Sequence, residues 1–257
     1  MSTAFVIADH TNGVSRLTLN RPDAFNALSE GMLESLQNAL DTLPTETRVV
    51  VLAAKGRAFC AGHDLKEMRK NTDQPYFDAL FQRCSQLMTT LLSIPQPVIA
   101  EVQGLATAAG CQLVGSCDLA VASKQATFAV SGIDVGLFCS TPSVALSRNV
   151  SRKRAMHMLM TGEFIDADTA CDWGLINRSV DSDKLQDSVM ELANRIIGKS
   201  EVAVRTGKAL FYKQLECGID DAYTLASHAM ACNMMAYDVG EGIDAFIEKR
   251  SPEFKNR

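Results

Sequence analysis

The sequence has no uninterrupted apolar run of the roughly 20 residues that a membrane-spanning helix needs. Its most apolar segment, residues 98–122, is broken by polar and charged residues that include Glu101 and Asp118. The first ten residues have neither the basic start and long apolar run of a secretion signal nor the arginine-rich face of a transit peptide. We therefore expect a soluble, cytoplasmic protein without a membrane span.

An excess of basic residues is also missing, since 25 Lys and Arg stand against 30 Asp and Glu, for a net charge of −5. Proteins that bind the nucleic-acid backbone are usually basic, so the composition argues against a nucleic-acid partner. The sequence contains neither a GxGxxG fingerprint nor a Walker A loop. An enzyme that binds a nucleoside triphosphate or a nicotinamide dinucleotide therefore has no support.

The eight cysteines form no CxxC pair, and no histidine lies near Cys111 and Cys117 in the sequence to complete a zinc site. A chain of 257 residues without a secretion signal is not a typical disulfide scaffold. We therefore expect reduced, mostly buried thiols and no metal site.

Apolar patterning predicts an α/β core followed by a helix-rich C-terminal part. Residues 49–52 and 98–102 are short continuous apolar runs, typical of strands buried on both faces. Residues 5–19 have the pattern of a hairpin that turns at an Asn-Gly pair. We expect Ser29 to cap a helix with one apolar face, and a second such helix over residues 77–91.

Two segments that contain glycine directly follow predicted strands, at residues 58–67 and 103–112. Residues 104–110 are small and are expected to form a loop, with a short helix beginning near Ala108. Sharp turns of this kind leave backbone N–H groups unpaired, and two such groups can stabilise a developing oxyanion. The alternative is that both segments are ordinary turns between a strand and a helix.

Several motifs, in the same order and spacing, resemble the enoyl-CoA hydratase/isomerase (crotonase) superfamily over essentially the whole chain. They lie at residues 19–22, 26–28, 56–67, 97–104, 110–113, 117–119, 173–176 and 245–250. Residues 108–113, 135–142 and 211–215 match the signatures of one branch of that family.

The resemblance implies a spiral of ββα units over residues 1–195 and a helical oligomerisation region over residues 196–257, within one continuous domain. It implies a homotrimer or a dimer of trimers, hence a hexamer, and coenzyme A as part of the substrate rather than a resident cofactor. The backbone N–H groups of His63 and Ala109 would form the oxyanion hole for an acyl-CoA thioester. The other residues implied in binding are Ala61, Gly62, Asp64, Leu65, Lys66 and Gly110. Phe246 and Lys249 would lie at the nucleotide end, and Lys249 could come from a neighbouring subunit.

The sequence departs from the family where hydratases carry two catalytic glutamates. Gln112 and Gly132 occupy those positions, so neither carboxylate is present. An amide is no useful base near neutral pH, and losing one acid–base group costs about 10²–10⁴-fold in rate. We therefore expect enoyl-CoA hydration, the lyase reaction of fatty acid metabolism, to be slow. Asp134 could replace a missing carboxylate if residues 132–134 form a strand, because alternate residues would then share a side. A structural role for Asp134 is the alternative.

Two other function classes stay open. A non-catalytic acyl-CoA binder fits the missing carboxylates, whereas a different thioester reaction, decarboxylation or thioester hydrolysis, fits the retained oxyanion segments. A thioesterase would draw its nucleophile from Cys139, Ser140 or Thr141, but a nucleophile needs an activating base and no histidine is near in sequence.

Overall fold

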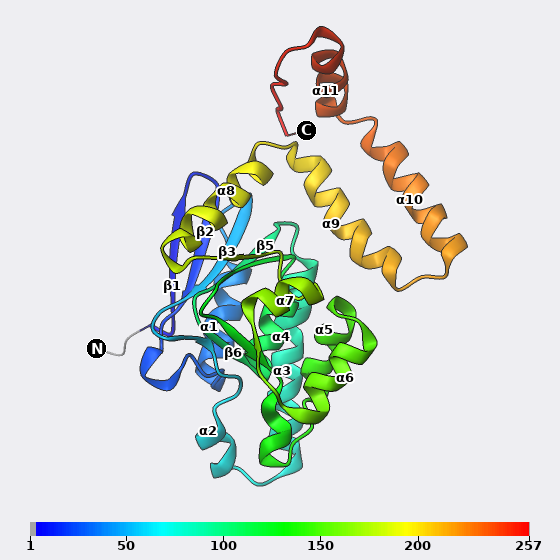
Figure 1. The fold of residues 1–257 in the computed structure, drawn as a ribbon. Coiled ribbons are helices and arrows are strands. Elements are labelled where there is room, and N and C mark those ends of the chain that lie inside the picture. Colours follow the sequence, from blue (N-terminus) through cyan, green and yellow to red (C-terminus); the bar gives the residue numbers. More distant parts are fainter. Residues whose placement is uncertain (1–3, 257) are drawn as a thin grey trace.

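The structure, a computed structural model, describes residues 4–256. Within this range the strands form two sheets (Figure 1). The larger, six-stranded sheet has the order β1 (Val6–Thr11), β2 (Val14–Leu19), β3 (Val49–Ala54), β5 (Val98–Val102), β7 (Leu119–Ser123) and β10 (Arg178–Val180). The smaller, four-stranded sheet has the order β4 (Ala58–Cys60), β6 (Leu105–Thr107), β8 (Thr127–Ala129) and β9 (Ile165–Asp166).

The larger sheet is buried on both faces. Strands β2, β3, β5, β7 and β10 run parallel, while β1 and β2 form the predicted antiparallel hairpin. Along β3, Val50 and Leu52 face one apolar cluster, and Val49 and Val51 face a second one together with Val189 of α8 (Leu185–Ile197). This two-sided burial explains why the strand is a continuous apolar run rather than an alternating one.

Helices cover the sheets as the apolar periodicity predicts. In α1 (Glu30–Asp41) the Ser29 side chain accepts a hydrogen bond from the Met32 N–H, and the apolar face is buried. The predicted helix over residues 77–91 is α3 (Gln74–Ser93), which buries Leu80, Leu87 and Leu91. The remaining helices before the C-terminal region are α2 (Leu65–Lys70), α4 (Ala109–Gly115), α5 (Ser140–Asn149), α6 (Arg152–Thr161), α7 (Ala167–Trp173) and the 3₁₀ helices η1 (Pro22–Ala24), η2 (Ser131–Val135) and η3 (Ser182–Lys184).

The core repeats a ββα unit, as expected. In β3-β4-α2, β5-β6-α4 and β7-β8-α5, the first strand joins the larger sheet, the second joins the smaller sheet, and a helix follows, whereas β1 and β2 before α1 both belong to the larger sheet. The segment 104–110, expected to be a loop, instead contains β6, because Ala106 pairs with Cys60 on one side and with Phe128 on the other. The parallel pairing of β4 and β6 places the ends of both strands side by side.

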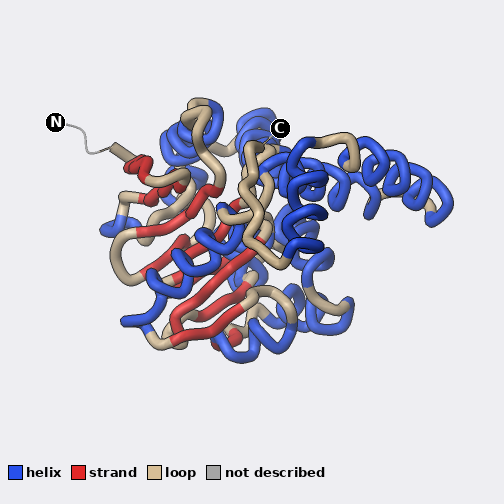
Figure 2. Tube along the Cα trace, turned by 90° about the horizontal axis from the view of Figure 1, so that it is seen from above, coloured by secondary structure: helices blue, strands red, loops and turns tan. Residues whose placement is uncertain are grey.

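Helices α9 (Glu201–Leu215), α10 (Ile219–Asn233) and α11 (Tyr237–Glu248) extend away from this core (Figure 1). Figure 2 shows the strands grouped among helices, with a helical arm reaching to one side. The buried Lys208 fastens α9, donating from Nζ to the carbonyls of Leu91 (2.8 Å) and Gln96 (2.9 Å) and to Asp118 Oδ2 (2.7 Å). Within residues 4–256, no helix has the length and apolarity needed to cross a bilayer.

Candidate active site

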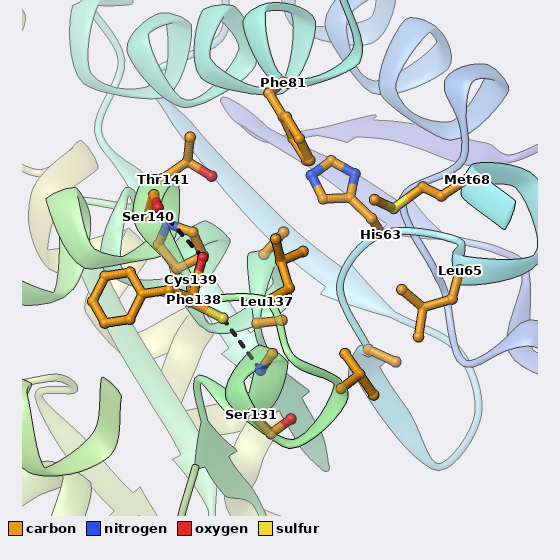
Figure 3. A pocket seen from close by; sticks show the side chains of 16 residues that line it. His63, Leu65, Met68, Phe81, Ser131, Leu137, Phe138, Cys139, Ser140 and Thr141 are labelled. Atoms are coloured by element: carbon orange, nitrogen blue, oxygen red, sulfur yellow. Dashed lines mark hydrogen bonds between the residues drawn. The ribbon is translucent and has the colours of Figure 1, made fainter. Parts of the chain in front are cut away.

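A cavity of about 280 Å³ opens beyond the ends of β4, β6 and β8 of the smaller sheet, next to α2, α3 and the start of α5. Its lining comes from four segments: residues 61–68, Phe81 of α3, residues 108–109, and residues 131–142 (Figure 3). Most of the lining is apolar, with Leu65 and Leu137 among its side chains. Of the predicted site residues, Ala61, His63, Leu65, Ala109 and Gly132 line this cavity.

The two predicted glycine segments touch each other at the floor of the cavity. Gly62 has φ +86°, and a Cβ added to it would lie 2.9 Å from Ala108 Cβ and 3.2 Å from the Ala109 nitrogen. A Cβ on Gly110 would lie only 2.0 Å from the Cys60 carbonyl oxygen. Both glycines are therefore required by close backbone approach, and this approach brings the turns that carry His63 and Ala109 together.

The N–H groups of His63 and Ala109 have no hydrogen-bonding partner among the described residues. Ala109 is the first residue of α4, where N–H groups lack partners within the helix. His63 pairs with Leu28 in a parallel bridge in which Gly62 O accepts the Leu28 N–H (2.8 Å), so the bridge leaves the His63 N–H unused. Two unpaired amides thus border one cavity, which is the arrangement an oxyanion hole needs.

Ala108, which joins β6 to α4, has an unusual backbone conformation with φ 51° and ψ −121°. Residues other than glycine rarely adopt it, and such strain costs about 1–3 kcal/mol. The Ala108 N–H donates to the Ala129 carbonyl (3.0 Å), which holds the strained residue against β8. The strain lies directly before the Ala109 amide.

Neither Gln112 nor Gly132, at which the resemblance predicts the two glutamate positions, offers a free polar side chain to the cavity. Gln112 is buried in α4 and is absent from the cavity lining, and its Oε1 atom has no partner among the described residues. Gly132 does line the cavity, but its N–H donates to Cys139 Sγ (3.3 Å). A Cβ added to Gly132 would lie 2.6 Å from the Leu137 carbonyl oxygen and 2.7 Å from that sulfur. The Gly132 position is therefore closed to any side chain in this loop conformation.

The structure does not bring Asp134 into the cavity. Residues 131–135 form η2 rather than a strand, so the side-to-side alternation that favoured Asp134 does not apply. The Asp134 side chain is exposed and lies against Gly162, since a Cβ on that glycine would be 2.9 Å from Asp134 Oδ2.

Other polar groups line the cavity instead. The Ser131 hydroxyl is 2.9 Å from the Thr107 hydroxyl, a pair that sequence reasoning missed because residues 24 positions apart meet only through the β6-β8 pairing. Burial raises the pKa of the Cys139 thiol, although the Gly132 N–H opposes this shift. A thiol of this kind stays protonated at neutral pH and is a poor nucleophile.

Two predicted residues of the 61–66 segment serve the local fold. Asp64 Oδ1 caps α2 by accepting the N–H groups of Lys66 (3.0 Å) and Glu67 (3.1 Å), and Asp64 Oδ2 lies 2.8 Å from Arg21. Burial opposes ionisation, but Arg21 and the capped amides outweigh it and hold the pKa of Asp64 below its usual value. The Lys66 side chain is exposed on α2.

Phe246 and Lys249 lie far from the cavity of their own chain. Both are exposed at the end of α11, which Figure 1 places at the opposite end of the molecule from α2. Within one chain the structure therefore does not join them to the other predicted site residues.

This spiral of ββα units, with two unpaired amides beyond neighbouring strands of its smaller sheet, is the crotonase fold, and the chain belongs to the enoyl-CoA hydratase/isomerase family. Residues 9–257 match the sequence profile of that family.

Individual relatives show which members of the family this chain is similar to. The chain is 46% identical to human enoyl-CoA hydratase domain-containing protein 3, mitochondrial, over 95% of this chain and 82% of that protein. The crystal structure of that human protein has a TM-score of 0.94 and 45% identity, covering 97% of this chain and 100% of the other. A crystal structure of an enoyl-CoA hydratase from Mycobacterium smegmatis has a TM-score of 0.96 and 56% identity, and the match covers 97% of this chain and 98% of the other. The branch indicated by the sequence signatures is confirmed by the human relative.

Proposed function

We propose that the protein binds an acyl-CoA or enoyl-CoA thioester in the cavity and polarises the thioester carbonyl between the N–H groups of His63 and Ala109. The observation that carries this proposal is the contact of the Gly62 and Ala108 turns, which sets two unpaired amides at one cavity wall. The apolar lining around Leu65, Met68 and Phe81 suits an acyl chain.

We further propose that hydration of an enoyl-CoA is slow in this protein. Water addition to the β-carbon needs a group that takes the water proton and a group that protonates the α-carbon. The Gly132 position is closed, and the amide of Gln112 offers no base. The chain therefore retains carbonyl polarisation without the paired carboxylates of a typical hydratase.

A non-catalytic acyl-CoA binder is the second candidate, because the same two positions remove the acid–base pair while leaving the amides in place. A covalent thioesterase is not proposed, since burial keeps the Cys139 thiol protonated and no base contacts it among the described residues.

We propose a homotrimer, or a dimer of trimers, for the assembly. The helical arm carries large apolar side chains that one chain leaves exposed, among them Met235 at 86% and Phe246 at 85%. Such a surface is typical of an interface between subunits. In that assembly Phe246 and Lys249 would reach the nucleotide end of CoA bound to a neighbouring copy. A role in fatty acid metabolism and a cytoplasmic location remain predictions from the sequence.

A pair of ligands tests the proposed polarisation without changing the protein. Butyryl-CoA carries the thioester carbonyl, whereas the thioether butyl-CoA lacks it and leaves both amides unpaired. Each lost hydrogen bond is worth about 0.5–1.5 kcal/mol, so isothermal titration should show butyryl-CoA binding about 5-fold to 150-fold more tightly. Equal affinity for the two ligands would rule out hydrogen bonding of the amides to the thioester carbonyl. If neither ligand binds, the proposed function is ruled out.

A further inference from the structure

The imidazole of His63 is a buried polar group that the proposed function leaves unused. Both of its ring nitrogens are shielded from solvent, and neither makes a hydrogen bond of normal geometry within residues 4–256. The same side chain lines the cavity. Native structures pair nearly all such atoms, so a ring beside a cavity whose nitrogens make no hydrogen bond of normal geometry needs an explanation.

Aromatic packing fixes where the ring lies. The His63 ring meets the Phe81 ring edge to face, with centroids 5.3 Å apart, and Phe81 stacks on Phe77 at 6.3 Å. Figure 3 shows the imidazole reaching from the loop before α2 to Phe81 of α3, beside Met68. These apolar neighbours hold the ring, and the Leu28 backbone lies close enough to favour its protonated form without making a hydrogen bond of normal geometry. A bound ligand could therefore supply the partner that the other nitrogen lacks.

The ring is also in the right protonation state for proton transfer. Burial lowers the pKa of His63, and the Leu28 backbone opposes this shift only in part. The imidazole is therefore neutral at neutral pH, with one nitrogen free to accept a proton. No other ionisable side chain with these properties lines the described cavity, since burial keeps Cys139 protonated.

We propose that the His63 imidazole is the proton-transfer group of this cavity and exchanges a proton with the α-carbon of a bound acyl thioester. This inference rests on the proposed thioester binding. In the step, the α-carbon–hydrogen bond breaks, and its electron pair enters the enolate, whose oxygen is stabilised by the N–H groups of His63 and Ala109. The proton moves to an imidazole nitrogen. Return of a proton or a deuteron from the ring re-forms the thioester.

His63 thus has two separable roles, because its amide belongs to the backbone and its imidazole to the side chain. Replacing the side chain removes the base and leaves the oxyanion amide in the chain. One neutral imidazole would then do part of the work for which hydratases use two carboxylates.

Proton exchange with solvent gives a direct test. Butyryl-CoA is incubated with the protein in D₂O, loss of its α-proton signal is followed by NMR, and its Kd is measured by titration. The wild type should exchange the α-protons, whereas His63→Gln should do so about 10²–10⁴-fold more slowly with a Kd within about threefold. His157→Gln is the matched control, since His157 is exposed on α6 and bonded to Glu163 (2.9 Å); its exchange rate should equal that of the wild type.

His63→Phe is the second variant, because it keeps an aromatic ring beside Phe81 and removes both nitrogens. It should show the same loss of exchange if His63→Gln does not fold. Exchange at the wild-type rate in a folded His63 variant would overturn the inference, as would a wild type that binds butyryl-CoA without exchanging its protons. A wild type that binds no thioester would overturn the proposed function, and this inference with it.

Discussion

Two parts of the candidate site, which we call the amide wall and the carboxylate wall, differ in what builds them. The amide wall, residues 60–63 and 107–110, depends on backbone geometry, in which glycines allow two strand ends to touch. The carboxylate wall, where the resemblance predicts the positions of two glutamates, depends on the side chains at residues 112 and 132. In this chain the amide wall is complete, whereas the carboxylate wall holds a buried amide and a closed glycine position.

The difference shows which part of a reaction a fold can retain when side chains change. Carbonyl polarisation needs N–H groups that every residue except proline supplies, so Ala108 and Ala109 can build the turn as long as Gly62 and Gly110 allow the approach. Acid–base catalysis needs particular side chains, and neither Gln112 nor Gly132 supplies a carboxylate. Overall similarity therefore predicts thioester binding better than it predicts hydration.

We expect the largest effect from a substitution that disrupts the amide wall. Gly110→Ala places a Cβ 2.0 Å from the Cys60 carbonyl oxygen, which belongs to the backbone and cannot move aside cheaply. We expect a loss of about 3 kcal/mol or more in unfolding free energy, together with loss of butyryl-CoA binding. Denaturant unfolding and titration measure both.

Gly207→Ala is the control for that change, because a Cβ there meets nothing within 4 Å and the residue lies inside α9. It should leave binding intact and stabilise the helix by about 0.5–1 kcal/mol. A Gly110→Ala protein of wild-type stability would show that the two turns are not in contact.

The second test tries to rebuild the carboxylate wall. The double variant Gln112→Glu, Gly132→Glu restores both residue types, yet the Leu137 carbonyl and Cys139 sulfur occupy the path of the new side chain at residue 132. We expect no gain in crotonyl-CoA hydration, measured by loss of the enoyl absorbance. Gln112→Glu alone is the comparison, and it should also show no gain in crotonyl-CoA hydration. A gain of 100-fold in the double variant would mean that the loop opens to admit the glutamate.

A smaller effect separates strain from function on the amide wall. Ala108→Gly relieves the conformation at φ 51° and ψ −121°, at the cost of extra freedom in the unfolded chain. We expect a net gain of about 1 kcal/mol in unfolding free energy and an unchanged preference for butyryl-CoA over butyl-CoA. If the preference disappears, the Ala108 methyl or its strain positions the Ala109 amide.

The smallest effect is a pH dependence of stability. The pKa of His63 lies below its ordinary value of 6.5 in the folded protein because of burial. Below pH 6.5 the unfolded chain binds a proton that the folded protein resists, so His63 lowers the unfolding free energy as the pH falls toward its native pKa. His63→Gln should remove this part of the acid destabilisation in denaturant titrations at matched pH. An identical pH profile for variant and wild type would contradict a buried, neutral imidazole.

Much of the fold follows from local patterns in the sequence. The continuous apolar runs at 49–52 and 98–102, and the Ser29 cap, each depend on neighbours within a few residues, and each was confirmed. The family motifs likewise indicate the two turns of the amide wall.

The carboxylate wall could not be predicted in the same way. Its geometry depends on contacts between segments, such as Gly132 with Cys139, and on η2 forming where a strand would have turned Asp134 inward. The unpaired His63 ring also depends on Phe81, which is 18 positions away on α3. Side chains that meet only through tertiary packing leave no periodic signal in the sequence.

The most direct test of the central claim follows one bound ligand over time. Crotonyl-CoA labelled with ¹³C at the thioester carbonyl is mixed with the protein, and its infrared spectrum is recorded. We expect the carbonyl stretch to move to lower frequency on binding, as two amides polarise it, while the enoyl bond persists over many minutes. An unshifted carbonyl, or hydration that is complete as soon as the ligand binds, would contradict an intact amide wall beside a missing carboxylate wall.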